Sequence, residues 1–272
     1  MRIALCNKTL DDRPIEAFFQ LAAESGFDAV EIIPGSLGTP VLHADPAMRV
    51  QILQVARAMG LEIIAMNSLL QHAPTLNLVT RDAALRARSS EELVAAVRLG
   101  SQMGARTIVV GSPRQRCAPA DASFNEATRL FADEICPAAD LAHDLGLTLC
   151  LEPLVHSLTN FMNDTSEGIA VAKSIDHPAV KLVLDVKQIS QETSTFEEAV
   201  KTALPWLAHV HLNDANTQAP GEGKTDFRPI LRELRHVGYN GVISIEAFAF
   251  DGDPAVILDR SRTYLEQILD VI

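Results

Sequence analysis

Short apolar runs rich in valine, isoleucine and leucine alternate along this chain with longer amphipathic stretches. Most of the runs are continuously apolar instead of strictly alternating, which is typical of parallel strands that are covered on both faces. They predict eight strands, at residues 2–7, 29–33, 62–67, 107–111, 148–152, 181–185, 208–213 and 242–246. The stretches between them have the spacing of helices with one apolar face.

Helix boundary signals support this alternation of strands and helices. Asp45 and Pro46 supply an N-cap and a first-turn proline, and Gly60 ends the helix that they begin. Asp253 and Pro254 do the same for the last helix. Eight strands alternating with about eight helices predict an α/β protein with the (β/α)8 TIM-barrel fold. No linker or change in composition divides the chain, so we expect residues 1–272 to form a single domain.

A doubly wound open sheet is the alternative fold for the same alternation. Such sheets usually carry a glycine-rich phosphate loop after an early strand. The residues that follow the first predicted strand, Asn7-Lys8-Thr9, do not form that motif. The TIM barrel is therefore the preferred interpretation.

Composition and charge narrow the class of partner. The net charge of −12 argues against nucleic-acid binding and gives no support to binding of an anionic membrane. The four cysteines lack CxxC spacing, and no stretch has the pattern of a signal peptide or a membrane span. We therefore expect a cytoplasmic protein that acts on a small molecule.

Four ionisable residues close short apolar runs in the last four predicted strands: Glu152, Asp185, His211 and Glu246. Taken singly, each has a structural explanation, as a solvated acid, a helix cap or a core histidine. In a TIM barrel, however, the C-terminal strand ends meet at one face, so these side chains would converge. Together they predict one divalent metal site with ligands Glu152, Asp185, His211 and Glu246.

The types of ligand also predict the metal. No cysteine is among them, so we do not expect a structural zinc site. Three carboxylates and one imidazole suit Mn²⁺, with Mg²⁺ or Co²⁺ as alternatives, and leave positions open for the oxygens of a substrate.

Several blocks of sequence carry a resemblance to a known family. They are GFDAVEI (26–32), VVGSPRQR (109–116), CLEP (150–153), LVLDV (182–186), HVHLND (209–214) and GYNGVISIEAF (238–248). With these blocks the chain resembles the sugar phosphate isomerase/epimerase superfamily, the xylose isomerase-like TIM barrels, and its metal positions resemble those of the ketose 3-epimerases. The resemblance implies the same four metal ligands and a homodimer or homotetramer. It also implies that Glu152 and Glu246 are the catalytic acid and base on opposite faces of the substrate.

The predicted chemistry is proton abstraction next to a metal-bound carbonyl, through an enediolate. Return of the proton to the other face gives epimerisation, and return to the neighbouring carbon gives isomerisation. Loss of a β-leaving group instead would make the protein a lyase or dehydratase of a keto-sugar or polyol, including C-glycoside cleavage. A phosphoesterase of damaged DNA would need a histidine-rich multi-zinc site and a basic groove, and a non-catalytic barrel would bind no metal.

Three positions depart from the ketose 3-epimerase pattern. Leu158, Gln188 and Thr217 stand where those enzymes usually have a glutamate, a histidine and an arginine that hold the sugar. The resemblance therefore does not imply that this chain acts on the same substrate as the ketose 3-epimerases.

Other residues are expected to bind the substrate: His156, Lys187, Gln188, Arg116 and Asn213. Lys187 lies two residues past Asp185, so an extended backbone would point both side chains to the same side. We expect Glu31 to face the pocket or to pair with a nearby base. His209 should share a face with His211 and lie one layer deeper.

Overall fold

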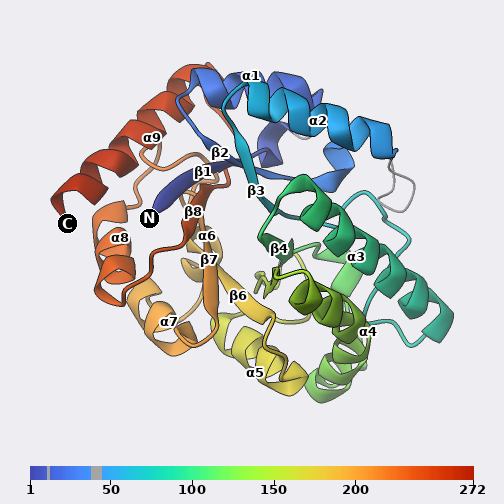
Figure 1. The fold of residues 1–272 in the computed structure, drawn as a ribbon. Coiled ribbons are helices and arrows are strands. Elements are labelled where there is room, and N and C mark those ends of the chain that lie inside the picture. Colours follow the sequence, from blue (N-terminus) through green and yellow to red (C-terminus); the bar gives the residue numbers. More distant parts are fainter. Residues whose placement is uncertain (11–12, 38–44) are drawn as a thin grey trace.

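The computed structural model describes residues 1–10, 13–37 and 45–272, and its parallel strands close into a barrel that helices surround (Figure 1). Each strand pairs with the next, and β1 also pairs with β8. The strands are β1 (Arg2–Cys6), β2 (Ala29–Ile32), β3 (Glu62–Met66), β4 (Thr107–Val110), β5 (Thr148–Leu151), β6 (Val180–Asp185), β7 (Leu207–Leu212) and β8 (Val242–Ile245). The predicted TIM barrel is confirmed, and every predicted strand is present with bounds within one residue.

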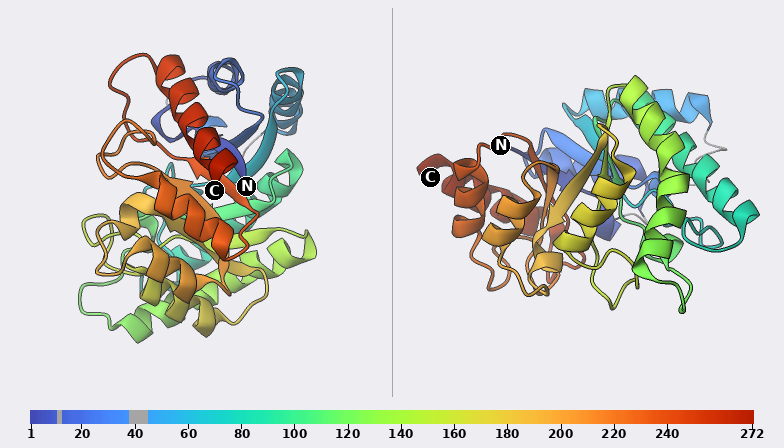
Figure 2. Two further views of the ribbon diagram at one scale, coloured as in Figure 1. Left: turned by 90° about the vertical axis from the view of Figure 1, so that its left-hand side faces the viewer. Right: turned by 90° about the horizontal axis from the view of Figure 1, so that it is seen from below.

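Helices lie around the strands in Figure 1, and the two side views show them on the outside of the barrel (Figure 2). The longer ones are α1 (Ile15–Glu24), α2 (Pro46–Ala58), α3 (Ala83–Met103), α4 (Phe124–Asp144), α5 (Thr165–Ile175), α7 (Phe196–Ala203), α8 (Phe227–His236) and α9 (Pro254–Val271). Short helices are α6 (Val186–Ile189) and the 3₁₀ turns η1 (Lys8–Leu10), η2 (Pro34–Leu37) and η4 (Arg114–Arg116). In the described ranges, no helix combines the length and the apolar character needed to cross a bilayer.

Both predicted Asp-Pro helix starts are confirmed. The side chain of Asp45 accepts a hydrogen bond from the backbone N–H of Ala47 at 2.8 Å, and Pro46 occupies the first turn. Asp253 accepts from Ala255 at 3.0 Å at the start of α9. Each cap satisfies one of the N–H groups that a helix leaves unpaired at its start.

The barrel interior is packed with apolar side chains below the level of the candidate ligands. Residues two apart on a strand face the same side, so Cys150 and Val183 lie one layer below Glu152 and Asp185. Cys150, Val183 and Val109 form one buried cluster. The barrel is therefore filled at this level, and the candidate ligands lie above the filled layer, at its C-terminal end.

The strand register sets the heights of the four candidate ligands. Asp185 and His211 are direct partners across β6 and β7. Glu152 and Glu246 were expected to be the last residues of their strands, but β5 and β8 end one residue earlier. Proline at 153 has no N–H and cannot extend the β5 ladder, which explains the early end of that strand. All four residues nevertheless lie at the same end of the barrel.

Gly100 lets α3 approach the barrel closely, because a Cβ there would collide with Cδ1 of the buried Ile108 on β4. We expect Gly100→Val to lower the free energy of unfolding by about 1–3 kcal/mol, through overpacking. Urea denaturation measures this change. Arg98→Val, at an exposed position of the same helix, is the control. Equal losses in the two variants would contradict the close approach.

Candidate metal centre

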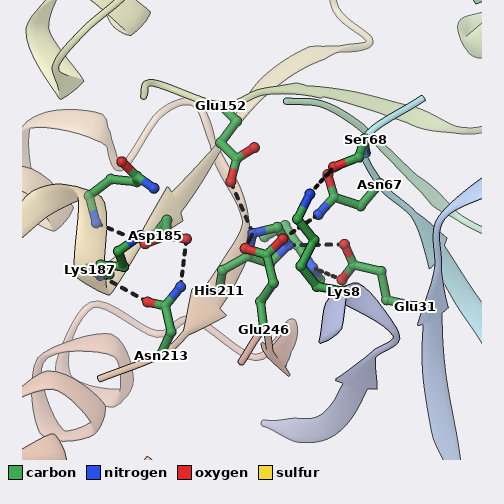
Figure 3. A network of polar contacts seen from close by, with 12 residues as sticks. Lys8, Glu31, Asn67, Ser68, Glu152, Asp185, Lys187, His211, Asn213 and Glu246 are labelled. Carbon is green, nitrogen blue, oxygen red and sulfur yellow. Dashed lines mark hydrogen bonds and ion pairs between the residues drawn. The ribbon is translucent and has the colours of Figure 1, made fainter. Parts of the chain in front are cut away.

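Glu152, Asp185, His211 and Glu246 come together at the C-terminal end of the barrel (Figure 3). All four are buried, and each offers a donor atom within 4.8 Å of the donor atoms of the others. Nδ1 of His211 lies 3.2 Å from Oε1 of Glu152 and 3.3 Å from Oε2 of Glu246. The structure thus brings the predicted quartet to one point.

The charges of this cluster fit a bound cation. Burial raises the pKa of Asp185, and the carboxylates of Glu246 and Glu152 raise it further, to about 7. Burial opposes the charge on Glu246 as well, but His211 outweighs it and holds the pKa of Glu246 below its usual value. Carboxylates that crowd each other in a buried site need positive charge between them. A divalent ion with oxygen and nitrogen ligands meets that need.

A second carboxylate, Glu31 at the end of β2, lies under the cluster and contacts two histidines. Its Oε1 is 3.0 Å from Nε2 of His211, and its Oε2 is 2.9 Å from Nε2 of His209. Burial alone would raise the pKa of Glu31, but the two imidazoles lower it well below its usual range. Glu31 thereby holds the His211 ring so that Nδ1 faces Glu152 and Glu246. As expected, Glu31 pairs with a base, and His209 lies one layer deeper.

Side-chain amides fix the carboxylates of two candidate ligands. Nδ2 of Asn67 donates to Oε1 of Glu246 at 2.9 Å, which leaves Oε2 facing His211. Nδ2 of Asn213 donates to Oδ2 of Asp185 at 2.9 Å. Asp185 also caps α6 through Oδ1, which accepts from the N–H of Gln188, so the predicted helix cap is confirmed, while the role of Asp185 as a metal ligand stays a prediction.

Gly111, the residue after β4, makes room for Glu152. A Cβ at position 111 would collide with Oε2 of Glu152. The absence of a side chain there lets the carboxylate lie over the strand end, so the sequence block around Gly111 contributes space to the site.

The prediction that an extended backbone points Lys187 to the same side as Asp185 is wrong. The backbone is not extended there, because α6 begins at Val186, directly after Asp185. The Lys187 side chain still lies at the barrel mouth, where Nζ is 4.4 Å from the centre of the Phe248 ring. Its backbone N–H donates to Oδ1 of Asn213 at 2.9 Å.

The other predicted substrate contacts fall in different surroundings. Asn213 uses both ends of its amide on the protein, at Asp185 and Lys187. Oε1 of Gln188 accepts from the N–H of Val155 at 3.2 Å. His156 is exposed and lines a groove of about 420 Å³ beside the loop that follows β5. Arg116 is fully buried after β4.

Three further residues have contacts at this end of the barrel that the sequence did not predict: Lys8, Asn67 and Phe248. Lys8 donates to Oε1 of Gln71 at 2.6 Å, and its Nζ lies 5.9 Å from the centre of the Phe248 ring. Phe248 comes two residues after Glu246, and Asn67 directly follows β3, so their positions past strand ends were the available signal.

The parallel β/α barrel is closed, and a buried, oxygen-rich candidate cation site lies at its C-terminal end. These two features define the protein as a TIM barrel with a candidate metal site. The chain belongs to the family described as xylose isomerase-like TIM barrel, whose model matches residues 19–268.

Named relatives and solved structures agree with this family. The chain is 26% identical over 239 residues to D-psicose 3-epimerase of Agrobacterium fabrum, covering 86% of this chain and 80% of that protein. It is 23% identical over 269 residues to fructoselysine 3-epimerase of Shigella flexneri, covering 94% and 91%. A crystal structure of D-psicose 3-epimerase in the presence of D-fructose superposes with a TM-score of 0.87, at 22% identity and 99% coverage of both chains. At this identity the superposition shows the shared fold.

Glu31→Gln is expected to weaken Mn²⁺ binding about 10- to 100-fold, because the amide no longer orients His211 as the carboxylate does. Calorimetric titration of the metal-free protein with Mn²⁺ measures the change. Glu62→Gln, which makes the same chemical change at the opposite end of the barrel, serves as the control. Wild-type affinity in Glu31→Gln would show that His211 needs no such support.

Mn²⁺ affinity should rise with pH between about pH 6 and about pH 8, because metal binding must displace protons. Asp185 has a pKa raised to about 7, and Glu31 and Glu246 overcome burial to raise the pKa of His211 well above its usual value. Both groups are protonated at the lower pH, so protons compete with the metal there. Titrations in buffers of different ionisation enthalpy count the released protons. A pH-independent affinity with no proton release would contradict the predicted competition between protons and the metal.

Proposed function

We propose that this protein is a divalent-metal-dependent sugar epimerase or isomerase that moves a proton beside a carbonyl group. The ketose 3-epimerases among its relatives support the epimerase class. The observation that carries the proposal is the placement of two glutamates around one imidazole. Glu152 comes from β5 and Glu246 from β8, and they approach His211 from different sides (Figure 3).

Mn²⁺ is the ion that we propose for the four ligands, with Mg²⁺ and Co²⁺ as alternatives. Three carboxylates and one imidazole give an oxygen-rich set with one nitrogen, which suits these ions. When bound, the cation polarises a sugar carbonyl and makes the neighbouring C–H group more acidic.

The chain's own residues then transfer the proton. Glu152 removes it from the carbon beside the carbonyl, and Glu246 returns one to the opposite face, which inverts that carbon. Asn67 keeps one oxygen of Glu246 occupied and so directs the other toward the reaction centre. Burial of both glutamates keeps bulk water away from the reacting groups.

The substrate is proposed to be a small sugar or keto-sugar, held by Arg116, Lys187, Gln188, His156 and Asn213. Leu158 is exposed on the loop after β5, and Thr217 uses its carbonyl to accept from the N–H of Phe248 at 2.8 Å. Neither side chain supplies the ionic contact that ketose 3-epimerases have at those positions, so a substrate other than their free ketose is favoured. The single domain, the homodimer or homotetramer and the cytoplasmic location stay predictions.

The direct test is hydrogen exchange in D₂O with Mn²⁺ and a panel of ketoses, keto-sugars and inososes. Wild-type protein should exchange the proton next to the carbonyl. Glu152→Gln and Glu246→Gln should each slow that exchange about 10²- to 10⁴-fold, because each removes a group that transfers the proton. Nuclear magnetic resonance follows the loss of the proton signal at saturating Mn²⁺.

Glu126→Gln, at an ion pair with Arg81, is the matched control and should exchange at the wild-type rate. Full-rate exchange in both active-site variants would refute the assignment. Product analysis separates the reaction types. Retention of every carbon and oxygen indicates epimerisation or isomerisation, whereas loss of water or of an aglycone indicates the lyase.

A further inference from the structure

Arg116 is a buried cation without a hydrogen-bond partner. Its side chain is fully enclosed, and Nε, Nη1 and Nη2 all lack a partner among the described residues. Burial lowers the pKa of Arg116 to about 10, although the nearby Glu152 opposes this shift. The guanidinium is therefore still charged at neutral pH. A buried charge without a partner strongly destabilises a protein, so its presence requires a reason.

The backbone around Arg116 is fastened on both sides, so the residue is not a loose surface arginine. On one side, the carbonyl of Gln115 accepts from the N–H of Leu78 at 2.8 Å. On the other, Asn160 accepts from the N–H of Ala118 at 2.9 Å and donates to its carbonyl at 3.0 Å. These bonds hold η4 between the loops that follow β3 and β5. The turn that carries Arg116 is thus fixed at the C-terminal end of the barrel.

Glu152, the acid that acts electrostatically on Arg116, is engaged elsewhere. Its carboxylate contacts His211 and belongs to the candidate metal site. Across the described ranges, Arg116 takes part in no ion pair, and neither do Lys8 and Lys187 at the same end of the barrel. In a chain with net charge −12, Arg116, Lys8 and Lys187 thus bring positive charge to the C-terminal end of the barrel without an ion pair among the described residues.

We propose that Arg116 is the binding subsite for an anionic group of the substrate, a carboxylate or phosphate carried by the keto-sugar; this rests on the proposed function. The planar guanidinium presents a fork of N–H groups that matches two oxygens of such a group. The hydroxyls of a neutral sugar would leave the charge buried without a counter-ion. The substrate class is therefore an acidic sugar, with the anion beside Glu152 and the carbonyl at the metal.

The test compares three ligands with one carbon skeleton: D-fructose, D-fructuronate and D-fructose 6-phosphate. Calorimetric titration of the Mn²⁺-loaded wild-type protein should show at least one acidic ligand binding about tenfold or more tightly than D-fructose. The tighter of the two acidic ligands identifies whether the anion is a carboxylate or a phosphate. Equal affinity for all three ligands would overturn the proposal.

Arg116→Met should abolish the preference for the acidic ligand over D-fructose, because it removes both the charge and the N–H donors of the guanidinium. Arg114→Met, at an exposed position of the same turn, should keep the preference. Arg116→Lys should restore part of it. Retention of the preference in Arg116→Met would overturn the proposal.

Thermal denaturation adds a second readout. Arg116→Met should equal or exceed wild type in ligand-free stability, because it removes an uncompensated buried charge. A clear loss of stability or failure to fold would mean that the guanidinium has a partner within the protein, and would also overturn the proposal.

The binding and stability measurements are independent of turnover. An Arg116-dependent preference without hydrogen exchange would contradict only the proposed function, whereas exchange without any preference would contradict only the subsite.

Discussion

The crowding of three carboxylates and one imidazole at the C-terminal end of the barrel is the constraint that organises this structure. Glu152, Asp185, His211 and Glu246 are buried within reach of a common point, where like charges repel unless a cation lies among them. The surrounding residues compensate this repulsion. Glu31 supports the imidazole from below, and amides hold two of the carboxylates in place.

Much of the fold was predictable because its strands are continuously apolar and its helices begin at clear capping residues. Parallel strands covered on both faces leave that pattern in any sequence. The convergence of the quartet followed from the same reasoning, since a barrel places the C-terminal ends of its strands at one face. The one-residue shift of Glu152 beyond β5 depends on backbone pairing that sequence periodicity does not resolve.

Features that depend on loops from distant parts of the chain could not be predicted. Lys187 was placed by assuming an extended backbone, but Asp185 caps a short helix at that point. The burial of Arg116 depends on bonds from Leu78 and Asn160, which lie on two other loops. Lys8 and Lys187 both approach Phe248, a contact among three segments that no local pattern encodes.

The central claim is that Glu152, Asp185, His211 and Glu246 hold one divalent cation. Anomalous X-ray scattering at the manganese edge, from crystals of the protein prepared with Mn²⁺, tests it most directly. Binding of one cation by these four residues predicts a single strong peak bounded by Nδ1 of His211 and one oxygen from each of the three carboxylates. A peak elsewhere, or none at saturating Mn²⁺, would contradict it.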